Sequence, residues 1–176
     1  MKFDSKYIAH ALSVYGFRDG LPLDSIEYVP MHQFRVATKE KLLLYVDNLQ
    51  CCVSLFASAA NFGFAAHINT MVMRGDEFYV DGNGKPIKCK RVEDLFDSII
   101  SSKVEPSESI KIGISKGCIY PGDSYPTMDM VYDGIADTKR KLEVKGYSVD
   151  LLEQDAMHFV LDTSSGKMIF PQKNME

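Results

Sequence analysis

Two residues of one apolar stretch, Cys52 and His67, carry the side chains of a nucleophile and of its base. They lie in residues 49–69, LQCCVSLFASAANFGFAAHIN, where most of the other side chains are apolar or small. A thiolate, not a thiol, is the reactive form of cysteine, and an adjacent imidazolium lowers the pKa of the thiol. The same ring later delivers a proton to a leaving group. The pair therefore indicates nucleophilic acyl-transfer chemistry if the fold brings the two side chains together.

Two β-strands are predicted to position this pair. Residues 51–57 and 63–69 are rich in residues that favour strands, and small residues between them favour a turn. A hairpin that turns at Ala59-Ala60 would place Cys52 directly opposite His67, on one face of the sheet. Cβ atoms of directly opposed residues lie about 4.5–5.5 Å apart, which predicts contact between thiol and imidazole.

Small neighbours on the same face, Gly63 and Ala65, would leave room for a substrate beside the pair. The third group, which orients the base, is open among Asn48, Gln50, Asn69 and a main-chain carbonyl. The alternative is structural, because cysteine often fills a protein core as a small apolar residue. In that case the chain is a binding or regulatory module with an inert Cys52.

The rest of the chain predicts an α/β domain with a mixed sheet and a second sheet layered on it. Helices are expected at 5–14, 92–102 and 125–145; strands at 34–38, 41–46, 109–114 and 147–152; a turn at 81–84; and a closing hairpin at 158–170. Without internal repeats or a long linker, residues 1–176 are interpreted as one domain.

Composition narrows the classes of partner. The 176 residues carry a formal net charge of −4, so a broad basic surface for nucleic acid or an anionic membrane is not expected. No apolar run approaches the ~20 residues of a membrane-spanning helix, and charges occupy the start of the chain where a signal peptide is apolar. Four scattered cysteines without a CxxC or HxxxH motif favour reduced thiols, a cytoplasmic location, and no metal or cofactor.

Several motifs resemble those of the chemoreceptor glutamine deamidases (CheD-like proteins). LQCCV is similar to the L-G-S-C-V signature of that family, and residues 63–67 match its G-x-x-x-H ending. The stretches KGYSVDLLEQD and HFVLDTSSGKMIF resemble its last helix, strand and hairpin. The resemblance implies Cys52 as nucleophile and His67 as base, hydrolysing a glutamine carboxamide on a partner protein, in chemotaxis for that family. It also implies a layered α/β/β sandwich over residues 42–170, with residues 1–40 as an extension without a recognised counterpart.

The chain departs from the family pattern at several positions. Val46 stands where the family has a catalytic threonine, and Gln50 replaces a glycine. Relatives among toxin deamidases can orient the histidine through a main-chain carbonyl, so this change leaves activity open. A second enzymatic alternative is a serine hydrolase, because GISKG (113–117) matches the G-x-S-x-G elbow with Ser115 as nucleophile.

Overall fold

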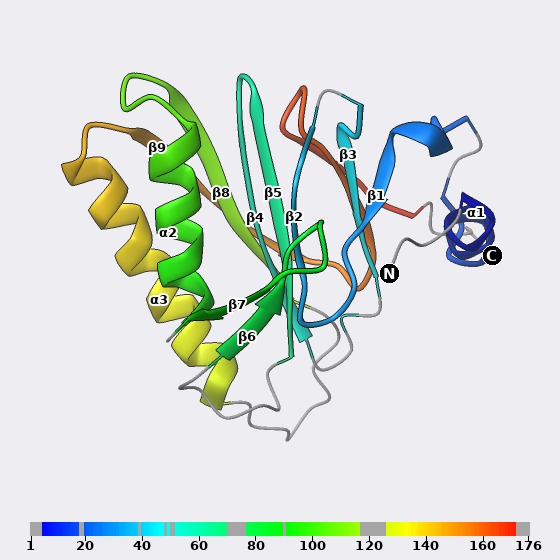
Figure 1. Ribbon diagram of the computed structural model, residues 1–176, viewed down its shortest axis with the longest axis horizontal. Helices are drawn as coiled ribbons and strands as arrows, with labels where there is room; N and C mark the ends of the chain where they lie inside the picture. The colour runs from blue at the N-terminus through cyan, green and yellow to red at the C-terminus, as the bar shows by residue number, and fades with distance from the viewer. Residues whose placement is uncertain are drawn as a thin grey trace.

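The chain forms layers of helices and strands in the computed structural model (Figure 1). The structure describes residues 5–17, 20–38, 40–47, 49, 52–69, 77–89, 91–116 and 126–171. Helices α2 (Val92–Lys103) and α3 (Pro126–Val144) cover one face of a five-stranded sheet, and a four-stranded sheet packs on its other face. Helix α1 (Ser5–Val14) lies on the outer face of the four-stranded sheet. The predicted mixed α/β architecture with layered sheets is thus confirmed.

The five-stranded sheet holds the stretch that contains Cys52 and His67. Its strand order is β2 (Phe34–Val36), β5 (Phe62–Asn69), β4 (Cys52–Ala59), β8 (Ser109–Lys116) and β9 (Ser148–Asp155). Only the β8–β9 pair in this sheet is parallel. Nearly every residue of β4 and β5 is buried, because one face packs against α2 and α3 and the other against the second sheet.

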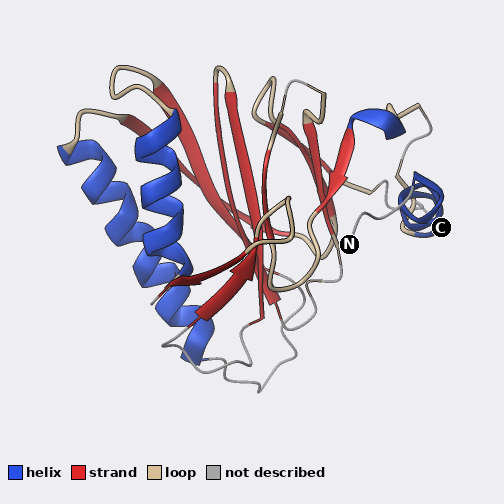
Figure 2. Ribbon diagram, in the orientation of Figure 1, coloured by secondary structure: helices blue, strands red, loops and turns tan. Residues whose placement is uncertain are grey.

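The four-stranded sheet completes the sandwich, and Figure 2 shows the two groups of strands lying between helices. Its order is β1 (Ile26–Tyr28), β3 (Leu43–Val46), β10 (Phe159–Asp162) and β11 (Lys167–Ile169), with β1 parallel to β3. A 3-10 turn, η1 (Leu23–Ser25), leads into β1, and β6 (Glu77–Val80) and β7 (Pro86–Cys89) form a separate hairpin. Among the described residues no helix is both long and apolar enough to span a membrane.

Most of the expected elements are present, and the main error concerns the first forty residues. Helix α1, the turn between β6 and β7, and the closing hairpin β10–β11 occur where the sequence predicts them. Strand β1 was not predicted. Together with β2 it makes residues 1–40 part of both sheets, since β1 pairs with β3 and β2 pairs with β5. This segment is therefore integral to the sandwich.

Candidate functional site

Cys52 and His67 lie on the same face of the five-stranded sheet but do not oppose each other. In the β4–β5 ladder Cys52 pairs with Asn69, and Ser54 pairs with His67. The expected direct pairing is wrong because the hairpin turns at Ala60-Asn61, one residue later than predicted. This change shifts the register by two residues, and an even shift keeps each side chain on its predicted face. Cys52 and His67 are therefore diagonal neighbours, a relation that separates Cα atoms by about 7–8 Å.

The imidazole of His67 is buried without a hydrogen-bond partner. Its exposed fraction is 3%, and neither ring nitrogen has a partner among the described residues. Burial lowers the pKa of His67 from 6.5 to about 4, while the main chain of Val29 raises it and the charge of His32 lowers it further. The ring is therefore neutral at pH 7. The sequence-based expectation of an imidazolium next to a thiolate is not what the resting structure holds.

The thiol of Cys52 is buried in the layer between the two sheets. Its exposed fraction is 2%, and it belongs to a buried cluster with Val46, Leu49 and Phe159. Its Sγ lies 3.8 Å from Sδ of Met31, and the Met31 side chain is 48% exposed. The thiol is thus inaccessible in this conformation, and the residue that contacts it, Met31, is half exposed.

One short segment, Val29 to Gln33, reaches both candidate residues. Met31 contacts Cys52, and the main-chain N–H of His32 donates to the carbonyl of His67 over 2.9 Å. The N–H of His67 in turn donates to the carbonyl of Gln33 over 3.0 Å. The main chain of Val29 also raises the pKa of the His67 ring, but neither ring nitrogen makes a hydrogen bond to a described residue, so the third group stays open.

Val46 occupies the interior position that the family resemblance assigns to a threonine. It ends β3 and is fully buried in the same cluster as Cys52. Because Val and Thr have nearly the same shape, the difference is one missing hydroxyl group in the layer that holds the thiol. Of the other candidates for the third group, Asn69 ends β5 opposite Cys52, whereas Asn48 and Gln50 lie outside the described residues, as do Cys51 and Cys118.

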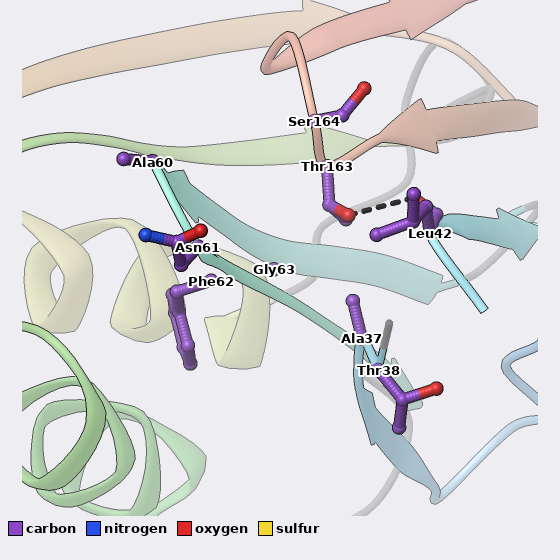
Figure 3. Close-up of a pocket in the computed structure, with 9 residues that line it drawn as sticks. All are labelled: Ala37, Thr38, Leu42, Ala60, Asn61, Phe62, Gly63, Thr163 and Ser164. Atoms are coloured by element: carbon purple, nitrogen blue, oxygen red, sulfur yellow. Dashed lines mark hydrogen bonds between the residues drawn. The ribbon is translucent and has the colours of Figure 1, made fainter. Parts of the chain in front are cut away.

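Among the described residues, the positions expected to leave room for a substrate beside the pair do not do so. Ala65 is fully buried, and a Cβ atom added to Gly63 would lie only 2.0 Å from Cγ2 of Thr163. Gly63 instead borders a cavity of about 470 Å³ at the opposite end of β5 (Figure 3). There the hydroxyl of Thr163 donates to the carbonyl of Leu42 over 2.7 Å. This cavity lies too far along the strand to serve His67.

Ser115 does not occupy a nucleophile elbow. It lies inside strand β8, and the next described element, α3, begins at Pro126. Its side chain is fully buried, and its hydroxyl donates to the carbonyl of Ala156 over 3.1 Å. Ser115 instead pairs with Ser54, which pairs with His67, so these three residues form a polar row across the sheet. The serine-hydrolase alternative loses its structural basis.

Met31 is the residue of this site that the sequence did not indicate. Its contact to Cys52 joins residues 21 positions apart, which no local pattern encodes. Within the described part of the chain, no three His, Cys, Asp or Glu side chains gather in a way that could hold a metal ion.

Two comparisons with known proteins give no relative for this chain: no protein-family model and no curated protein matches it.

Proposed function

We propose that this protein is a cysteine-dependent amidohydrolase that deamidates glutamine side chains of a partner protein. The observation that carries the proposal is the buried, unpartnered imidazole of His67 on the same sheet face as the Cys52 thiol. Buried polar groups nearly always have a hydrogen-bond partner, so an exception calls for a reason. A role of His67 as the base that accepts the proton of the Cys52 thiol would be such a reason.

The resemblance to the CheD-like deamidases supports the same proposal. The family signature aligns its nucleophile with Cys52 and its histidine with His67, and the layered α/β/β fold that the resemblance implies is compatible with this mixed α/β sandwich. A reducing compartment such as the cytoplasm, where the partner protein would be found, would keep Cys52 as the thiol that the reaction needs.

The proposed reaction needs no group beyond the side chains and water. As the carboxamide reaches Cys52, the thiol proton passes to His67 and the sulfur attacks the amide carbon. The imidazolium then gives this proton to the departing ammonia, which leaves a thioester. His67 next takes a proton from water, and the hydroxide attacks the thioester carbon and breaks the C–S bond. His67 then returns its proton to the Cys52 sulfur, and the new carboxylic acid gives its proton to the released ammonia.

A neutral imidazole fits this sequence of steps. With a pKa of about 4, His67 is unprotonated over the physiological range and is available as a base. Both side chains must move, because diagonal neighbours stand about 7–8 Å apart at Cα and neither nitrogen of His67 is paired in the resting state. The active arrangement is therefore one that forms when a substrate binds.

A second candidate is an inert binding or regulatory module on the same scaffold. Two observations favour it: the thiol and the imidazole are only 2% and 3% exposed, and Val46 lacks the hydroxyl group of the family threonine. In this case the thiol would be a core residue and His67 a buried histidine.

Incubation with glutamine-rich helical proteins, including the cytoplasmic fragment of a bacterial chemoreceptor, distinguishes the two candidates. An amidohydrolase adds about one dalton to a glutamine-bearing peptide, as NH₂ is replaced by OH, and this gain is read by mass spectrometry. Cys52→Ser and His67→Asn should abolish the gain, because each removes a group that the reaction uses. His158→Asn is the matched control, since it removes a histidine that lies elsewhere.

A gain that persists in Cys52→Ser would refute the cysteine mechanism. No gain on any protein of the panel would favour the inert module.

A further inference from the structure

We propose that Met31 occupies the path by which a substrate glutamine reaches Cys52, so that the chain carries its own substrate mimic. This inference rests on the proposed function, and it identifies the direction from which the carboxamide approaches. It is drawn from the contact of Met31 with Cys52, from the shape of the two side chains, and from the turn that presents Met31.

The contact places an atom of Met31 where a reacting atom is needed. Sδ of Met31 lies 3.8 Å from Sγ of Cys52, slightly beyond the ~3–3.5 Å separation of a near-attack arrangement. The Met31 side chain is 48% exposed while Cys52 is only 2% exposed. Methionine therefore reaches from solvent to an otherwise buried nucleophile, as a substrate side chain must do.

Methionine and glutamine side chains have the same length and are both unbranched. In each, two methylene groups follow Cα, and the third heavy atom is Sδ in methionine and the carboxamide carbon Cδ in glutamine. A glutamine that follows the course of Met31 would thus bring its carboxamide carbon to the place of Sδ, next to the Cys52 thiol. A shorter asparagine side chain would not reach this point.

The backbone that carries Met31 is a strained turn tied to the site. The N–H of Gln33 donates to the carbonyl of Pro30 over 3.1 Å, and His32 has a φ of 60°. A positive φ at the third position is the requirement of a type II turn, which usually takes glycine there. Holding histidine in this conformation costs on the order of 1 kcal/mol, and such strain clusters at functional sites.

Gap filling is the ordinary role of methionine in a core. It does not account for this residue, because a gap-filling side chain is enclosed and Met31 is half exposed. The hydrogen bond from His32 to the carbonyl of His67 also fixes the turn on the strand that holds the proposed base. The turn therefore keeps its position relative to both reacting side chains.

The variant Met31→Gln tests the mimicry without an identified partner protein. The introduced carboxamide would be attacked by the Cys52 thiol, ammonia would leave, and water would release a carboxylate. Peptide mass mapping of the purified full-length protein should show a gain of about one dalton at position 31. Met31→Gln combined with Cys52→Ala, or with His67→Asn, should keep its mass.

Met31→Ala and Met31→Leu test independently whether Met31 covers Cys52, that is, whether it shields the thiol from solvent. The readout is alkylation of Cys52 by iodoacetamide with Cys89 as internal reference. Alanine should raise the labelling rate of Cys52 severalfold without changing that of Cys89, and leucine, which fills a similar volume, should not. Met31 is half exposed, so both variants are expected to fold. An unchanged mass of Met31→Gln, or an unchanged labelling rate in Met31→Ala, would overturn the inference.

The proposed function and the mimicry by Met31 can be refuted independently of each other. If wild-type protein deamidates a panel protein while Met31→Gln keeps its mass, the function stands and the mimicry is refuted. If Met31→Ala exposes Cys52 but His67→Asn leaves the labelling rate of that variant unchanged, the cover stands and the catalytic pair is refuted.

Discussion

The protonation state of one buried residue, His67, links stability to the proposed chemistry. Enclosure between two sheets removes the water that would stabilise the charged ring, so the folded protein holds the imidazole neutral. A protein core gains nothing from an unpaired histidine, and an apolar residue there would pack without this penalty. The presence of His67 in the core is thus the feature that most needs a functional reason.

Stability should fall as the pH is lowered from about 6.5 to about 4. In this window the unfolded chain protonates His67 at its ordinary pKa of 6.5, while the folded chain resists protonation until about 4. The unfolded state therefore binds more protons, and the folded state loses about 3 kcal/mol across the window. Urea unfolding at several pH values should show this loss in the wild-type protein and a correspondingly smaller one in His67→Asn.

The titration of His158 does not affect this comparison of wild type with His67→Asn. Burial also lowers its pKa, but it is present in both proteins, so its contribution cancels in the difference. Parallel stability curves for wild type and His67→Asn would contradict the burial of a neutral His67.

At the scale of elements, the two outer helices depend on a glycine that faces a buried carboxylate. Gly134 lies in α3, and a Cβ atom there would lie 2.3 Å from Oε1 of Glu93 in α2. Glu93 is only 1% exposed. The close approach of α2 and α3, which cover the helical face of the five-stranded sheet, therefore requires glycine at this position.

Gly134→Ala should destabilise the protein by about 1–3 kcal/mol, because the new methyl group overlaps the Glu93 side chain. In a Glu93→Ala background the overlapping atoms are gone, and the same change should be neutral or stabilise by up to about 1 kcal/mol through helix propensity. A double-mutant cycle of urea-unfolding free energies measures this coupling.

Gly82→Ala is the matched control for this cycle. Its nearest neighbour, Cδ of Arg35, would lie at an ordinary 3.5 Å, so a small effect is expected. An equal cost of Gly134→Ala in both backgrounds would show that the two helices do not meet as described.

Local pattern predicted most of the elements, though not strand β1, and it did not predict the register of the central hairpin. Alternation of side chains placed Cys52 and His67 on one face, and that prediction is confirmed. The turn residues were misplaced by one, since Ala59-Ala60-Asn61 offers no glycine or proline that would fix the turn. The prediction that thiol and imidazole are in direct contact was therefore wrong, although the prediction that they share one face was right.

For the whole molecule, the sequence predicted layered sheets but not how strand β1 and the segment that follows it pack on them. Strand β1 has only three residues and lies parallel to β3, a pairing that depends on long-range contacts. The segment that carries Met31 enters between β1 and β2, and its contact with Cys52 exists only once both sheets are assembled. Contacts of this kind follow from tertiary packing, and periodicity contains no information about them.

Cys52 and His67 share one sheet face as diagonal neighbours, and we propose that they work as a pair. The most direct measurement is the rate at which iodoacetamide labels Cys52 at pH 7 in Met31→Ala, which opens access to the thiol, and in the same variant combined with His67→Asn or with His158→Asn, with Cys89 as the reference thiol. His158 is a suitable control because it is half-buried and stacks on Tyr15, with ring centroids 3.7 Å apart. We expect labelling of Cys52 to slow about tenfold or more when His67→Asn is added and to stay unchanged when His158→Asn is added. Equal rates at Cys52 in all three proteins would contradict the account.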